Sequence, residues 1–204
     1  HAYTHWHNIL EQNVIDTTLQ QLLEFRLIYP QHSKFTLVEF PDTLTALLHI
    51  TTSCNLTCDY CYLSQRGAEI SLATGYAIID TVFRSAMQHH FPGVKLKYTG
   101  GEPLLCFSKI RQLHQYAMRS AEEQDLALDG VILSNGTLLT SEIVESIKSL
   151  NLRLMISLDG LRDYHNCQRY FQNISGSFEA VSYAIDLALS HNLIPDISIT
   201  VSSR

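Results

Sequence analysis

The strongest constraint on the fold is an alternation of strand-like and helix-like segments that begins at Thr45. Short apolar segments of strand length lie at 46–50, 94–98, 131–133, 152–158 and 196–201. Between them, apolar residues recur at helical spacing behind candidate capping residues, namely Ser71, Ser108, Thr140 or Ser141, and Ser177. Strands that alternate with helices favour an α/β fold with a parallel sheet. Right-handed crossovers then bring the loop after every strand to the same edge of the sheet.

The alternation divides the chain into an N-terminal extension, residues 1–44, and a core, residues 45–204. Within the extension, the apolar spacing over 9–27 predicts a helix, and the alternation over Phe35–Phe40 predicts a strand that is half buried. The last residues, up to Arg204, lie on or just after the fifth strand. We therefore expect a core that is truncated after strand 5.

Composition excludes several classes of protein. The formal net charge is −6 and no run of Lys or Arg occurs, so neither a nucleic acid nor a membrane surface is indicated as a partner. No apolar stretch approaches the roughly 20 residues of a spanning helix, and no signal-peptide pattern is apparent, so we expect neither feature. Clustered cysteines in a chain without a disulfide framework favour a reducing compartment, and we expect a cytoplasmic protein.

Three of the five cysteines lie directly after the first core strand. Cys54, Cys58 and Cys61 have the spacing C-x3-C-x2-C. Thiolates are soft ligands that suit iron–sulfur clusters, which normally take four ligands, so three cysteines leave one iron open to an external ligand. The alternative is a non-enzymatic zinc-binding module with His49, Cys106 or a nearby His as the fourth ligand, although zinc sites more often show paired C-x2-C motifs.

With Tyr60 immediately before the third cysteine, this segment resembles the signature of the radical S-adenosylmethionine (SAM) superfamily. The resemblance implies a partial (β/α)6 TIM-like barrel and a [4Fe–4S] cluster held by the three cysteines. It also implies that SAM binds the open iron and is cleaved reductively to a 5′-deoxyadenosyl radical, with an external electron donor of the flavodoxin or ferredoxin type.

A second motif follows the second core strand. Gly100, Gly101, Glu102 and Pro103 resemble the Gly-Gly-Glu-Pro motif of the superfamily, which contacts the amino group of SAM. Two glycines allow the backbone to approach a ligand closely, and Glu102 is suited to accept hydrogen bonds from an ammonium group. Taken alone, the same four residues are typical of a common turn.

Two further motifs follow the third and fourth strands. Ser134 and Asn135 belong to a segment that resembles the Thr-Asn-Gly-Thr segment of the superfamily, and alone they indicate an Asn-Gly turn. Ser157 and Asp159 lie where polar groups of the superfamily reach the ribose of SAM. Asp159 is equally suited to cap the following helix or turn.

The segment from His165 to Arg169 resembles a His-Asp-x-x-Arg segment of peptide-modifying members, with Asn166 in place of Asp. The resemblance implies that Arg169 pairs with the carboxylate of SAM, which suits a planar guanidinium. The alternative is a solvated surface arginine. Thr200 and Val201, on the fifth strand, are expected near the adenine. The sequence does not identify a catalytic acid, base or radical-quenching residue.

The motifs together resemble most the superfamily members that modify peptides and proteins, such as sulfatase maturases and maturases of ribosomally made peptides. The expected function is hydrogen abstraction from a peptide or protein, leading to crosslinking or oxidative maturation. The alternative within the superfamily is a small-molecule or RNA substrate. The extension, through Phe35–Phe40, is a candidate docking site for a leader peptide.

Such members usually carry auxiliary iron–sulfur clusters in a C-terminal SPASM domain. Only Cys106 and Cys167 follow the triad, which is fewer than the four ligands of another cluster. They are interpreted as small buried residues, or as auxiliary ligands within a longer protein.

Overall fold

The structure is a computed structural model that describes residues 16–17, 19–21, 43–64 and 67–201. The chain divides into two units, His1–Phe40 and Pro41–Arg204. In the first unit, the described residues 16–17 and 19–21 are helical. The rest of the helix expected over 9–27 and the strand expected over Phe35–Phe40 lie outside the described residues.

The second unit is built on a parallel sheet. Its five strands are β1 (Thr43–Thr51), β3 (Gly93–Gly100), β4 (Ala127–Ser134), β5 (Leu152–Ser157) and β7 (Asp196–Ser198). They lie side by side in sequence order, β1-β3-β4-β5-β7, and every neighbouring pair is parallel. Within residues 43–64 and 67–201 the sheet remains open, with β1 and β7 at its edges. This confirms the α/β class and a partial TIM-like core.

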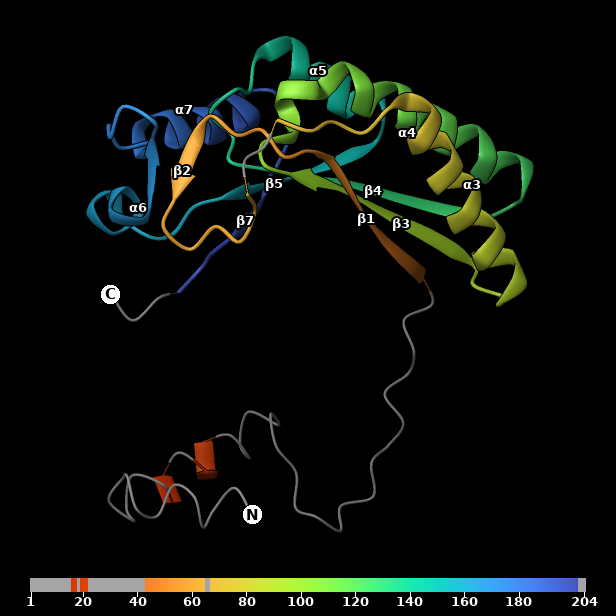
Figure 1. The fold of residues 1–204 in the computed structure, drawn as a ribbon, viewed down its shortest axis with the longest axis horizontal. Coiled ribbons are helices and arrows are strands. Elements are labelled where there is room, and N and C mark those ends of the chain that lie inside the picture. The colour runs from red at the N-terminus through yellow and green to blue at the C-terminus, as the bar shows by residue number, and fades with distance from the viewer. Residues whose placement is uncertain (1–15, 18, 22–42, 65–66, 202–204) are drawn as a thin grey trace. The chain divides into compact units, whose positions relative to one another are not determined.

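Helices cover one face of this sheet (Figure 1). They are α3 (Leu72–Gln88), α4 (Phe107–Glu123), α5 (Ser141–Ser149) and α7 (Phe178–Ser190). The hydroxyls of Ser71 and Thr140 cap α3 and α5 as predicted, accepting hydrogen bonds from the backbone N–H groups of Thr74 and Ile143. The prediction that Ser108 caps a helix is wrong, because a 3-10 helix, η1 (Pro103–Cys106), leads directly into α4 at Phe107.

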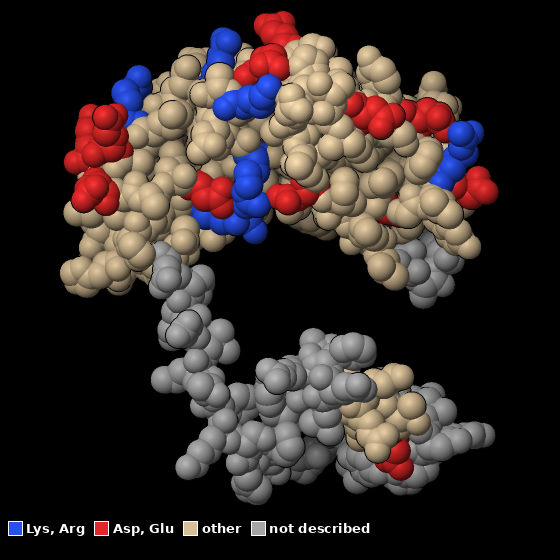
Figure 2. Space-filling model, turned by 180° about the vertical axis from the view of Figure 1, so that it is seen from behind, with Lys and Arg blue, Asp and Glu red and all other residues tan. Residues whose placement is uncertain are grey.

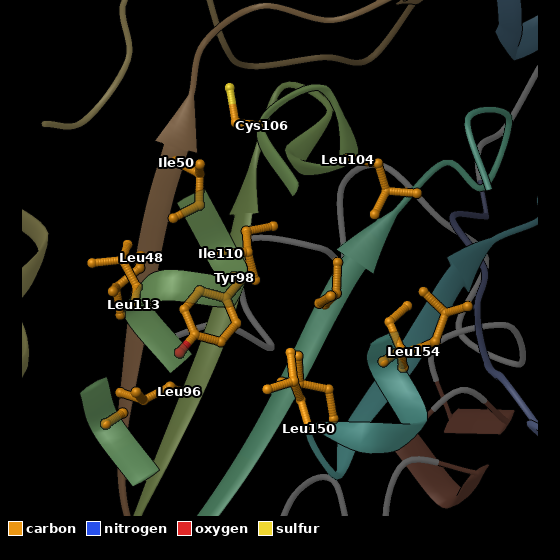
Figure 3. Packing of buried hydrophobic residues seen from close by; sticks show 14 of the residues in the cluster. Leu48, Ile50, Leu96, Tyr98, Leu104, Cys106, Ile110, Leu113, Leu150 and Leu154 are labelled. Atoms are coloured by element: carbon orange, nitrogen blue, oxygen red, sulfur yellow. The ribbon is translucent and has the colours of Figure 1, made fainter. Parts of the chain in front are cut away.

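The core lies between the sheet and these helices, and Figure 3 shows part of it. On β3, Val94, Leu96 and Tyr98 are fully buried, so the residues between them project from the opposite face of the sheet. Tyr98 is also a polar anchor: its hydroxyl lies 3.1 Å from Nδ1 of His114, whose Nε2 lies 3.2 Å from the Leu150 carbonyl oxygen. Because a carbonyl only accepts, His114 carries its proton on Nε2 and Nδ1 accepts from the tyrosine.

Besides η1, three elements in the described part of the core were not predicted from the sequence. They are the helix α6 (Arg162–Gln168) and the strands β2 (Leu56–Cys58) and β6 (Arg169–Phe171). β2 and β6 form a separate antiparallel pair in which Cys58 lies opposite Arg169. Strands of three residues are too short to leave a periodic pattern in the sequence. The last core strand is also shorter than predicted, since β7 ends at Ser198.

No helix in the described part of the chain is long and apolar enough to cross a membrane.

Candidate functional site

The three cysteines of the triad lie on the loop between β1 and α3. Within the loop, the Cys54 thiol accepts a hydrogen bond from the Leu56 N–H at 3.4 Å, and the Cys61 N–H donates to the Cys58 carbonyl at 3.0 Å. Cys58 is further fixed because it ends β2, which pairs with β6. Local turns and one short strand pair therefore set the path of the cysteine loop.

The three thiols line one cavity of about 400 Å³ at the carboxyl end of the sheet. Predicted site residues from the cysteine loop, from the ends of β3, β4 and β5 and from two later segments share this wall: Tyr60, Gly100, Gly101, Ser134, Asn135, Ser157, Arg169 and Thr200. Parallel strands bring their following loops to one edge, which is why motifs far apart in the sequence meet here. The cavity is also lined by residues that lie in or beside the motifs but were not predicted as site residues, namely Leu56, Tyr62, Leu63, Thr99 and Leu133.

The two glycines of the second motif lie against the start of the cysteine loop. A Cβ on Gly100 would lie 2.2 Å from the Thr51 carbonyl oxygen, and one on Gly101 would lie 2.1 Å from that of Ser53. Gly100 also has φ +143°, which side-chain-bearing residues rarely adopt. The N–H groups of Gly101 and Glu102 donate to these two carbonyls, each at 2.8 Å. The glycines are thus required for close approach to the protein's own backbone, in addition to facing the cavity.

Glu102 differs from the expectation. Its side chain is fully buried and is absent from the cavity wall. One carboxylate oxygen accepts from the Leu104 N–H at 2.9 Å and the Ser134 hydroxyl at 2.7 Å, and the other accepts from the Asn135 N–H at 2.7 Å. Burial raises the pKa of Glu102, although these donors act against the rise. The carboxylate joins the ends of β3 and β4 and does not face an ammonium group in the cavity.

Asn135 braces the cysteine loop from the end of β4. Its amide Nδ2 donates to Asn55 Oδ1 at 2.9 Å and lies 3.8 Å from the Cys54 sulfur. Its Oδ1 accepts from the N–H and hydroxyl of Thr137, and Thr137 in turn accepts from Asn55 at 2.8 Å. The segment is an Asn-Gly turn, with Gly136 at φ +78°, and it also contacts a cysteine of the triad.

Asp159 also differs from the expectation that it reaches a ribose. Its side chain is fully buried and does not line the cavity. The carboxylate accepts hydrogen bonds from the Tyr60 hydroxyl, from Arg169 Nε at 2.7 Å and from the Thr200 N–H at 2.9 Å. Burial acts to raise the pKa of Asp159, but these donors outweigh it and the pKa lies below its ordinary value. Asp159 therefore positions three residues of the cavity wall.

Arg169 is held at the cysteine loop and is not a solvated surface residue, because only 12% of its side chain is exposed. Its guanidinium lies 5.3 Å from the centre of the Tyr60 ring, and Nη1 lies 3.9 Å from the Cys58 sulfur. Among the described residues that line the cavity, Arg169 is the one cation, and it lies beside a thiol of the triad.

His165 supports this arrangement from α6. It is fully buried, and its Nδ1 accepts from the Asp159 backbone N–H at 3.2 Å. Its Nε2 lies 2.9 Å from the Ser177 hydroxyl, which donates to the Arg169 carbonyl at 3.0 Å. Burial lowers the pKa of His165, in keeping with a neutral ring that carries its proton on Nε2.

The remaining predicted residues lie away from the cavity. Pro103 is buried at the start of η1, and Val201 is 90% exposed. Cys106 is buried, as expected of a small core residue, whereas Cys167 is exposed, which contradicts that interpretation. Neither Cys106 nor His49 lines the cavity of the triad, so neither is placed as a fourth zinc ligand.

The donor set fits a cluster better than a single ion. Across residues 16–17, 19–21, 43–64 and 67–201, no three His, Cys, Asp or Glu side chains converge as one metal ion requires. The three thiols instead surround a shared space, which is the arrangement that a three-cysteine iron–sulfur site needs. Burial raises the pKa of Cys58 to about 11 despite the nearby Arg169, and burial also raises the pKa of Cys54. Binding of iron must therefore displace protons from these thiols.

Comparison with known proteins gives relatives of several activities. The chain is 27% identical over 149 residues to the serine-type anaerobic sulfatase-maturating enzyme of Bacteroides thetaiotaomicron, covering 69% of this chain and 35% of that protein. It is 27% identical over 170 residues to the subtilosin biosynthesis protein AlbA of Bacillus subtilis, covering 81% and 35%. It is also 29% identical over 150 residues to a probable GTP 3′,8-cyclase of Methanococcus maripaludis, covering 72% and 46%. The chain thus spans about a third to a half of the length of these relatives.

The fold is similar to that of native anSMEcpe solved with bound AdoMet and the Kp18Cys peptide, with a TM-score of 0.67 and 21% identity. The similarity covers 76% of this chain and 42% of the other. The sequence model of the Radical SAM superfamily matches residues 48–202, which include the cysteine triad and every other element of the cavity wall. The chain therefore belongs to the radical SAM superfamily, whose enzymes use a [4Fe–4S] cluster and SAM.

Proposed function

We propose that this chain is the radical SAM core of an enzyme that modifies a peptide or protein by crosslinking or oxidative maturation. The names of two relatives, a sulfatase-maturating enzyme and a subtilosin biosynthesis protein, support this substrate class. A neighbouring structure of the same fold holds AdoMet together with a peptide. Because the chain spans only part of these relatives, the activity is proposed for the enzyme to which the core belongs.

In this proposal Cys54, Cys58 and Cys61 hold the cluster, since they are the three thiols of the cavity wall. The remaining wall, from Gly100 and Gly101 to Ser157 and Thr200, receives SAM. When bound, the cluster would supply the electron for the reductive cleavage of SAM, and the core would direct the resulting hydrogen abstraction to the substrate.

The chain's own residues position and shield the reactants. Arg169, held by Asp159, offers a fixed cation to the SAM carboxylate. Tyr60 closes the wall beside it and keeps its proton, because burial, with the hydrogen bond to Asp159, raises the pKa of its hydroxyl to about 12. The buried Glu102 and Asn135 fix the wall's backbone, so the polar groups need no rearrangement when a ligand arrives.

The single observation that carries the proposal is the grouping of three thiols, one arginine and the glycine pair around one cavity. The test is anaerobic reconstitution with iron and sulfide, reduction with dithionite or a flavodoxin, and addition of SAM. We expect 5′-deoxyadenosine from the parent protein and none from the variant in which the three cysteines are alanine. A reconstituted, brown parent protein that forms no deoxyadenosine would contradict the proposal.

A small-molecule substrate is the second candidate, because a probable GTP 3′,8-cyclase is among the relatives. RNA is not favoured. On the face that Figure 2 shows, Lys and Arg side chains are interspersed with Asp and Glu side chains, and no continuous basic surface is present on that face. An assay with deuterated substrates distinguishes a peptide substrate from a small-molecule substrate. Transfer of deuterium into deoxyadenosine from deuterated peptides supports the proposal, whereas transfer only from a deuterated nucleotide such as GTP overturns it.

A further inference from the structure

A second cavity, of about 380 Å³, lies on the face of the sheet that the helices leave uncovered. Its wall comes from four neighbouring strands: Lys95, Lys97, Val131, Leu133, Arg153, Met155, Asp196 and Ile197. Lys95 and Lys97 project to this face because Val94, Leu96 and Tyr98, which alternate with them on β3, are buried among the helices. The cavity is therefore a part of the interior of the partial barrel.

Most charges of this cavity are paired with one another. Arg153 binds both oxygens of Asp129, at 3.1 and 3.0 Å, and reaches Asp196 at 2.9 Å. Lys95 binds the same Asp129 at 3.0 Å. Two cations are thus matched by two carboxylates in a network.

Lys97 is the exception. No ion pair in residues 43–64 and 67–201 involves Lys97, although it lines the same cavity. Its neighbours across the strands, Leu47 and Val131, are both apolar. Lys95, Lys97 and Arg153 together outnumber Asp129 and Asp196 by one positive charge, in a chain whose formal net charge is −6.

This unpaired cation lies next to the cavity of the triad. Leu133 lines both cavities, and Thr99, which lines the first, follows Lys97 by two residues on the same face of β3. Two residues along a strand span about 7 Å. A ligand of a few residues that places a carbon in the first cavity can therefore place an anionic group against the Lys97 amine.

We propose that Lys97 is the binding group of a carboxylate subsite that selects substrates bearing a carboxylate close to the reacting carbon. The carboxylate is an Asp or Glu side chain of the peptide or its C-terminus. This assignment of substrate rests on the proposed function. The Lys95–Asp129–Arg153–Asp196 network holds the surrounding wall, so that among the described residues of this cavity Lys97 is the cation whose charge is free for the ligand.

The test is a titration of the protein with two probes, acetyl-Glu-amide and acetyl-Gln-amide, which differ only in the charge of the side chain. Lysines are reductively methylated with a ¹³C label, which keeps their charge, and their signals are followed by NMR. The signal of Lys97 is assigned as the one that is present in the spectrum of the parent protein and absent from that of Lys97→Arg. Signals of Lys109 and Lys148, which hold other partners, serve as internal controls.

We expect acetyl-Glu-amide to shift the Lys97 signal saturably and to bind about tenfold more tightly than acetyl-Gln-amide, as loss of a charge-assisted hydrogen bond predicts. Ligand-observed NMR of unlabelled proteins should show binding lost in Lys97→Gln and kept in Lys97→Arg and Lys148→Gln. Equal affinity for the two probes, or unchanged binding in Lys97→Gln, overturns the subsite. Inorganic phosphate that binds more tightly than acetyl-Glu-amide overturns the carboxylate class.

Failure of this proposal is distinguishable from failure of the proposed function. The titration contains neither SAM nor a reductant, so it measures anion binding alone. The assay of deoxyadenosine formation in the absence of substrate measures radical chemistry alone. The affinities of the two probes are compared on the parent protein, which requires no variant. A misfolded variant therefore cannot hide the result.

Discussion

Asp159 and Arg169 form a buried ion pair in which one carboxylate oxygen lies 2.7 Å from the guanidinium Nε. The pair joins the end of β5 to the start of β6, and β6 pairs with the strand that carries Cys58. The same carboxylate also receives the Tyr60 hydroxyl and the Thr200 N–H. One side chain thus couples the cysteine loop to the end of the sheet.

We predict that Asp159→Asn lowers the free energy of unfolding by about 3 kcal/mol, because the change leaves a buried arginine without its counter-charge. Urea unfolding of the protein without iron, under reducing anaerobic conditions, measures the loss. The matched control is Asp163→Asn on the exposed side of α6, which should change stability by less than about 0.5 kcal/mol. Similar small losses in both variants would show that the ion pair contributes little.

Gly101→Ala tests the close approach between the glycine motif and the cysteine loop. The new Cβ would lie 2.1 Å from the Ser53 carbonyl oxygen, a backbone atom that cannot move without the loop. We expect a loss of at least about 3 kcal/mol in stability and less iron and sulfide bound on reconstitution. Thr99→Ala, near the end of the strand that Gly101 follows, is the control and should retain normal iron content. Full iron content in Gly101→Ala would contradict the prediction.

Glu102→Gln tests the role assigned to the buried carboxylate. The glutamine amide presents N–H groups to a position where the Leu104 N–H, the Asn135 N–H and the Ser134 hydroxyl already donate. At least one donor then loses its acceptor, and we expect a loss of about 2 kcal/mol in the free energy of unfolding. Glu122→Gln, exposed at the end of α4, should be neutral. If Glu102→Gln is equally neutral, the carboxylate does not join the two strand ends.

The positions of the site motifs were predictable because each follows a strand and parallel strands share one edge. The alternation therefore brought Cys54, Gly101, Asn135 and Ser157 to one cavity, as the sequence indicated. The direction of individual side chains was not predictable in the same way. A carboxylate at a strand end turns toward whichever donors the tertiary structure supplies, and for Glu102 and Asp159 these donors are buried within the protein.

The pairing of β2 with β6 could not be predicted from the sequence, for a different reason. It joins segments that are more than a hundred residues apart through three residues each, so no local period marks it. The contact of Arg169 with Cys58 follows from that pairing. The family motif indicated that Arg169 lies in the site, but only the fold places it beside the cysteine loop.

The buried His114 predicts a pH-dependent stability. Burial lowers its pKa to about 4 from an ordinary value of 6.5, although the hydrogen bond to the Leu150 carbonyl opposes the shift. Between these values the unfolded chain binds a proton that the folded protein does not. The contribution of His114 to stability is therefore complete above about pH 6.5 and is lost as the pH falls toward 4, by up to about 3 kcal/mol.

Urea unfolding at several pH values between 7 and 4 measures this contribution, compared with His114→Gln. The variant is expected to be less stable at pH 7, since it disturbs the hydrogen bond to Tyr98, but its stability should fall less steeply with decreasing pH. His89→Gln, at the exposed C-terminal end of α3, should keep the parent's slope. Because the comparison uses slopes, the contribution of other titrating groups cancels. Equal slopes in the parent and His114→Gln would mean that the folded protein protonates His114 without cost, so that the ring is not held neutral between Tyr98 and Leu150.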